Sequence, residues 1–173
     1  MNKIFMTQLR GLLEKTADQE ETMEDAARAA AQSIAAGGRF FLHGTGELKG
    51  IEAQAFDGAD PLPGAVRLTS AEDAGPMEMV WLFADSAESI RPLTENILEN
   101  GGHVLLVTPE AVEDLPPGSF SLATGVTRGL IPEESGKRTG RPHLLVSLHL
   151  YYDLLFLLRE ILEENDLLEE IEE

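Results

Sequence analysis

Two glycines one residue apart, Gly44 and Gly46, follow the apolar run RFFLH (residues 39–43) and precede residues 47–56, which have helical spacing. A glycine turn between a strand and a helix presents unpaired backbone N–H groups and the positive end of the helix dipole. Such a turn can bind an anion, and phosphate is its natural ligand. Glycine allows the close approach and the positive φ that the turn uses. The same pattern is also common as a simple turn.

The spacing of the glycines argues against a dinucleotide site. The Rossmann fingerprint is G-x-G-x-x-G, whereas Gly50 here gives G-x-G-x-x-x-G. Short-chain dehydrogenases place this strand near the N-terminus, but residues 1–38 have a helical pattern. Neither Tyr151 nor Tyr152 is followed four residues later by the lysine that those enzymes use.

A second loop with potential chemistry follows the apolar run MVWLF (residues 79–83). It reads ADSAES (residues 84–89) and places Ser86 and Ser89 at the start of a helical segment that runs to Asn100. Serine is a preferred helix N-cap. Two hydroxyls beside exposed backbone amides can also hold a phosphate, and the two roles are compatible.

Alternating strands and helices are expected to position both loops. Apolar residues at helical spacing predict two helices before the first strand, the second ending at Gly37 and Gly38. Strands are predicted at residues 39–43, 65–69, 79–83, 103–107 and 119–124, and later helices at 47–56, 87–100 and 142–163. Short continuous apolar runs are typical of strands buried on both faces, and their alternation with helices predicts a parallel sheet. We expect an α/β fold, a three-layer α-β-α sandwich with a five-stranded parallel sheet.

The length of 173 residues and the 43% hydrophobic content predict one domain with a full core. We divide it into an N-terminal helix (residues 1–19), an α/β core (20–163) and an acidic tail (164–173), which we expect to be a solvated or frayed helix end.

Composition and charge exclude several classes of function. A formal net charge of −18 disfavours binding to nucleic acid and to anionic membranes. The chain has no cysteine, hence no disulfide and no thiolate site. The apolar segment 144–158 is too short to span a membrane, and the first residues do not form a signal peptide. The histidines show no metal-ligand spacing. We therefore expect a cytoplasmic protein with no metal and no cofactor.

The segments AGGRFFLHGTGELKGIEAQAF and MVWLFADSAESIRPLTENILENGGHVLLVT, preceded by two helices, resemble a sugar isomerase (SIS) domain of the phosphoheptose isomerase type. The resemblance covers residues 20–160 and implies a flavodoxin-like sheet in the order 2-1-3-4-5. In that order the two loops lie side by side at the topological switch point, where open α/β sheets bind ligands.

The resemblance also implies a phosphosugar site in these two loops. The family patterns G-x-G-x-S and S-x-S-G-x-S/T are only partly matched, because Leu48, Ala84 and Ala87 stand where the family has two serines and a glycine. The expected substrate-binding residues are Gly44, Thr45, Gly46, Lys49, Ser86 and Ser89.

Aldose–ketose isomerisation needs a base that takes a proton from the carbon next to the carbonyl and an acid that serves the oxygen. The resemblance implies these roles for His149, near the start of the last helix, and for Glu52, on the helix after the glycine loop. The alternatives are a histidine buried in the core or an interface and a solvated glutamate.

Two functions follow from these features. One is a phosphosugar-binding protein with phosphoheptose-type isomerase activity, and the other is a non-catalytic module that senses a metabolite or serves as a scaffold. We also expect a homodimer or tetramer, because the last helix is apolar on nearly every face. The basic residues Lys137, Arg138 and Arg141 are expected in a surface loop (133–141) that could alternatively reach an anion bound by a neighbouring subunit.

Overall fold

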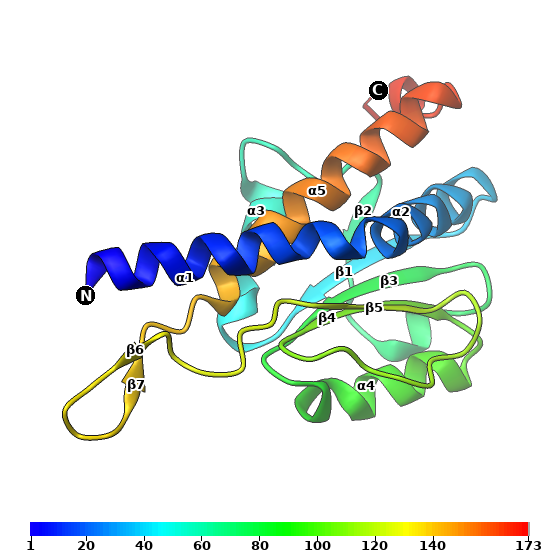
Figure 1. The fold of residues 1–173 in the computed structure, drawn as a ribbon. Helices are drawn as coiled ribbons and strands as arrows, with labels where there is room; N and C mark the ends of the chain where they lie inside the picture. The colour runs from blue at the N-terminus through cyan, green and yellow to red at the C-terminus, as the bar shows by residue number, and fades with distance from the viewer. Residues whose placement is uncertain (173) are drawn as a thin grey trace.

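The apolar runs form a five-stranded parallel sheet in the order β2-β1-β3-β4-β5 (Figure 1). The computed structural model describes residues 1–172 and confirms the predicted fold class and strand order. The central strands are buried on both faces, as their continuous apolar sequences predict. The strands are β1 (Phe40–Gly44), β2 (Ala65–Arg67), β3 (Met79–Phe83), β4 (His103–Thr108) and β5 (Phe120–Ala123).

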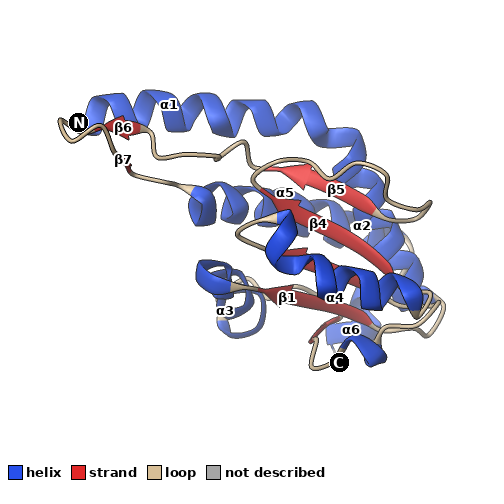
Figure 2. Ribbon diagram, turned by 90° about the horizontal axis from the view of Figure 1, so that it is seen from below, coloured by secondary structure: helices blue, strands red, loops and turns tan. Residues whose placement is uncertain are grey.

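Three helices cover one face of the sheet: α2 (Glu20–Ala35), α3 (Lys49–Asp57) and α5 (His143–Glu164). The alanine-rich face of α2 is buried, which lets this helix lie close to α5 and the sheet. Trp81 and Phe40 lie in this layer with ring centroids 4.7 Å apart. The other face is covered by α4 (Ala87–Glu99), as seen in Figure 2, where the molecule of Figure 1 is viewed from below.

The coverage of the α4 face is incomplete beside β1 and β2. The chain between β2 and β3 contains only a short 3₁₀ helix, η3 (Ala71–Asp73), where a longer crossover helix would otherwise lie. A groove of about 660 Å³ is left between the segment 68–72 and α4, with His43 of β1 at its wall.

The N-terminal segment forms α1 (Asn2–Lys15) and the 3₁₀ helix η1 (Thr16–Gln19). Leu9 on α1 packs with Val126, Leu130 and Val146, so that α1 lies along α5 and the loop after β5. A hairpin of β6 (Ile131–Pro132) and β7 (Arg138–Thr139) projects near the N-terminal end of α1 (Figures 1 and 2).

The acidic C-terminus is more ordered than the expected frayed end. After α5, the chain forms α6 (Leu168–Glu172), and Leu168 is buried in the same core cluster as α2 and α5. Among residues 1–172, none of the helices has both the length and the apolar character that crossing a membrane requires.

Candidate functional site

The glycine loop after β1 and the loop after β3 meet at the carboxyl edge of the sheet. Thr45 N–H donates to Phe83 O at 3.0 Å. Gly46 has φ +54° and lies against the side chain of Asp85, whose carboxylate would clash with a Cβ at this position. Since β1 leads to β2 on one side and β3 leads to β4 on the other, the two loops border the topological switch point.

The two serines of the second loop cap helix α4. Ser89 N–H donates to Ser86 Oγ at 3.1 Å, and the Ser89 hydroxyl donates to Ser86 O at 2.9 Å. The capping interpretation is therefore confirmed. The N–H groups of Ala87 and Glu88 open the first turn of the helix and have no acceptor within it.

The first loop contains one buried polar atom without a partner. Thr45 Oγ1 is shielded from solvent and makes no hydrogen bond within residues 1–172. Lys49 is exposed at the start of α3. Leu48, at the position where the SIS pattern has serine, is fully buried in the core beneath α5 and α3, which explains why this position is apolar.

His143 closes the same edge from the start of α5. Its Nε2 lies 2.9 Å from Ala84 O, and its Nδ1 lies 2.9 Å from Thr124 Oγ1, which also accepts from Val126 N–H at 3.3 Å. A carbonyl only accepts, so Nε2 carries the proton and Nδ1 accepts from the Thr124 hydroxyl. Burial lowers the pKa of His143, which keeps the ring neutral. Sequence reasoning missed this residue because its partners are distant in the chain.

Arg141 also reaches the crevice, on its own subunit. Its Nη2 donates to Asp85 O at 3.5 Å, and a pocket of about 200 Å³ lies between Arg141, Ser86, Glu110 and Thr127. The sequence grouped Arg141 with Lys137 and Arg138 in one surface loop, but the three side chains are placed differently.

Arg138 holds the β6–β7 hairpin through hydrogen bonds to Gly129 O at 2.6 Å and Leu130 O at 2.8 Å, whereas Lys137 is exposed. Within residues 1–172, no group of three or more His, Asp or Glu side chains has the arrangement of a metal site.

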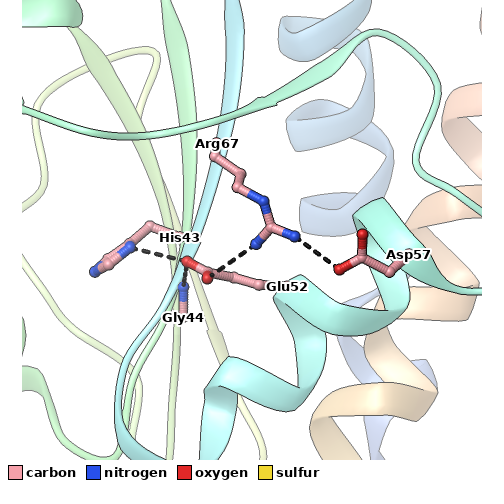
Figure 3. A network of polar contacts seen from close by, with 5 residues as sticks. All are labelled: His43, Gly44, Glu52, Asp57 and Arg67. Atoms are coloured by element: carbon pink, nitrogen blue, oxygen red, sulfur yellow. Dashed lines mark hydrogen bonds and ion pairs between the residues drawn. The ribbon is translucent and has the colours of Figure 1, made fainter.

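Glu52 lies at the centre of a polar network beside the glycine loop (Figure 3). Its Oε1 accepts from Gly44 N–H at 3.0 Å and lies 3.0 Å from His43 Nδ1, while Oε2 lies 3.4 Å from Arg67 Nη1. Arg67 also pairs with Asp57 at 2.8 Å. The alternative of a solvated glutamate is therefore wrong, because Glu52 is a largely covered side chain that organises the ends of β1 and β2.

His149 is placed elsewhere, on α5, with its Nε2 3.5 Å from Asp153 Oδ2 and both side chains partly exposed. No hydrogen bond or ion pair in residues 1–172 joins His149 to Glu52 or to the glycine loop. The structure thus brings Arg141 and Asp85 together with the two loops. The two predicted catalytic side chains lie apart, Glu52 with His43 and Arg67 and His149 with Asp153.

Residues 1–162 match the family described as "Domain of unknown function (DUF2529)". The chain belongs to the DUF2529 family. It is also 31% identical over 171 residues to the "Uncharacterized protein YwjG" of Bacillus subtilis (strain 168), a match that covers 95% of this chain and 99% of that protein.

Membership of the DUF2529 family corrects the assignment to the SIS domain family, which was wrong. The segments that carried the resemblance encode a strand, a glycine turn and a capped helix, elements that open parallel α/β sheets share. The positions that would distinguish SIS loops are Leu48, Ala84 and Ala87 here, and the first two are fully buried apolar residues.

Proposed function

We propose that this protein binds a small phosphorylated metabolite of the phosphosugar class in the crevice between the Gly46 loop and the start of α4. The observation that carries the proposal is the convergence of a glycine turn, with its buried and unpartnered Thr45 Oγ1, and the N-terminus of a 13-residue helix at one switch point. Buried polar atoms without partners are rare and call for a ligand or solvent partner.

The charges divide the crevice into two ends. Arg141 and the free N–H groups at the start of α4 supply the positive side of the pocket beside Ser86, which Asp85 and Glu110 also line, and this side is the one that favours a phosphate. The Asp85 carboxylate lies over Gly46 and would repel a phosphate there, but it accepts hydrogen bonds from sugar hydroxyls. The sugar hydroxyls are therefore assigned to the Gly46 end and the phosphate to the Arg141 end.

Binding without turnover is favoured by the state of the nearby acids and bases. Both ring nitrogens of His143 are hydrogen-bonded, and both carboxylate oxygens of Glu52 are occupied. His149 contacts Asp153. A base for the carbon next to a sugar carbonyl would need a free atom within hydrogen-bond reach of the ligand.

Calorimetry with sedentoheptulose 7-phosphate, glucose 6-phosphate, the unphosphorylated sugars and inorganic phosphate tests the proposal. We expect sugar phosphates to bind more tightly than phosphate or sugar alone, and Arg141→Gln to weaken binding by about tenfold. Lys137→Gln is the control, since this neighbouring basic residue lies outside the pocket.

If no sugar phosphate binds, or if both variants lose affinity equally, the proposal is wrong and a scaffold role is favoured. Incubation with ketose phosphates in deuterated water tests the absence of turnover. Deuterium incorporation next to the carbonyl would refute that part of the proposal.

A further inference from the structure

The groove on the α4 face contains an imidazole with one nitrogen fixed by a carboxylate. β2 pairs with β1 only as far as Leu42, whose carbonyl accepts from Leu68 N–H at 3.4 Å. The next donor along this side of β1, Gly44 N–H, is instead bonded to Glu52 Oε1 at 3.0 Å. The carboxylate that replaces the strand also reaches His43 Nδ1, at 3.0 Å.

This contact sets the direction of the His43 ring. A carboxylate accepts only, so the neutral imidazole carries its proton on Nδ1 and leaves the Nε2 lone pair free. Figure 3 shows the second ring nitrogen pointing away from Glu52, and the side chain of His43 is 30% exposed at the wall of the 660 Å³ groove. Glu52 is itself held by Gly44 N–H and Arg67, so the ring has a fixed support.

Two polar side chains that line the groove use donors within the protein, and the Ser70 hydroxyl accepts from Glu72 N–H at 3.3 Å. The Thr69 hydroxyl donates to Asp73 Oδ2 at 2.9 Å, and Asn100 Nδ2 donates to Ala71 O at 3.0 Å. The side chains that line the groove in the described chain include Glu72 and Glu99 and no lysine or arginine. The groove therefore offers acceptors and negative charge without a cation in its lining, whereas Arg141 lines the other crevice.

We infer that this groove is a second small-molecule site, in which His43 Nε2 accepts a hydrogen bond from the ammonium group of a small organic cation such as an aliphatic polyamine. Glu52 is the positioning residue, because it selects the tautomer that leaves Nε2 as an acceptor. The ligand supplies the positive charge that the lining of the groove lacks. The site is independent of the phosphosugar crevice in location and in ligand charge.

The test is a titration with spermidine at physiological salt, followed by calorimetry and by the NMR signals of the His43 ring. We expect saturable binding that shifts the His43 Cε1–H signal and that weakens by about tenfold or more in His43→Ala. Salt at this level suppresses loose association of the cation with a chain of charge −18.

Glu52→Ala and Glu52→Gln together separate positioning from packing. The glutamine Oε1 can still accept from Gly44 N–H and His43 Nδ1–H and so keeps the tautomer, whereas alanine removes the acceptor and releases the ring. We expect Glu52→Ala to weaken spermidine binding and Glu52→Gln to retain it, with the nitrogen shifts of His43 reporting the tautomer in each variant. His149→Ala is the control and should bind as the parent protein does.

Equal spermidine affinity of the parent and His43→Ala would overturn the inference, because it would show non-specific association with the acidic surface. The same holds if the His43 signals respond to glucose 6-phosphate and not to spermidine. Fluorescence of the buried Trp81 verifies that each variant is folded.

Discussion

Replacing His143 with alanine is expected to destabilise the fold strongly. The ring is fully buried, and its two hydrogen bonds join the start of α5 to Ala84, after β3, and to Thr124, after β5. Alanine removes both bonds and leaves a buried carbonyl and a buried hydroxyl without these partners. The start of α5 would then lose its two side-chain hydrogen bonds to the loops after β3 and β5.

The expected magnitude follows from those two groups. A buried polar group that loses its partner costs about 1–3 kcal/mol, so the variant loses about 2–6 kcal/mol of its free energy of unfolding. This is a large share of the roughly 5–15 kcal/mol that stabilises a typical domain. With a urea dependence of about 2–3 kcal/mol per molar, the unfolding midpoint falls by about 0.7–3 M.

The single tryptophan, Trp81, makes the measurement direct, because it is fully buried and its fluorescence changes on unfolding. The matched control is His149→Ala on the same helix, where the side chain is 39% exposed. A substitution at such a surface site changes stability by about 0.5 kcal/mol or less. Equal urea midpoints for the two variants would refute the role assigned to His143.

The pH dependence of stability provides a second test of the same residue. Burial lowers the pKa of His143 in the folded protein below its ordinary value of 6.5, so the unfolded chain binds the proton more readily. The stability linked to His143 is complete above that ordinary value and is lost as the pH falls below it. The stability advantage of the parent over His143→Gln should therefore be larger at about pH 7.5 than at about pH 5.5. An advantage that grows on acidification would contradict the assigned neutral state.

Three further outcomes are expected. Leu48→Ser should lower the free energy of unfolding by about 2–5 kcal/mol in urea titrations without creating a phosphate site, because Leu48 is fully buried; unchanged stability would contradict its place in the core. Gly46→Ala should lower the melting temperature, since φ is +54° and the new Cβ meets Asp85, whereas Gly11→Ala in α1 should raise it, since nothing lies within 4 Å of that Cβ. Light scattering should give a multiple of 18.8 kDa, since α1 and α5 expose several large apolar side chains, and a mass of 18.8 kDa would contradict the proposed oligomer.

Much of the fold could be predicted from local patterns. Apolar runs identified all five strands of the main sheet. The runs are continuous in the three central strands because a strand buried on both faces has to be apolar throughout, whereas the edge strands β2 and β5 are only partly covered. Gly37 and Gly38 correctly marked the end of α2, and Ser86 marked the start of α4. The lengths of β2 and β5 were overestimated by a few residues, because pairing with a neighbour decides where an edge strand ends.

The candidate site was predicted only in part, and the family assignment drawn from it was wrong. Gly44, Thr45 and Gly46 do lie beside the loop that contains Ser86, since strand order places both loops at one edge. Leu48 indicated correctly that the loop departs from the SIS pattern. A strand, a glycine turn and a helix cap are local features of many parallel sheets. They therefore indicate which edge of the sheet could bind a ligand better than they indicate a family.

The sequence by itself determined the succession of strands and helices along the chain, the buried faces and the helix caps. Each of these depends on residues within a few positions of one another. Tertiary structure alone decided that His143 bridges Ala84 and Thr124, that Asp85 covers Gly46, and that Glu52 holds His43. The first two contacts join residues from distant loops, and the third depends on where β2 leaves β1. Such contacts depend on how the elements pack and on the direction of each side chain, which no local spacing specifies.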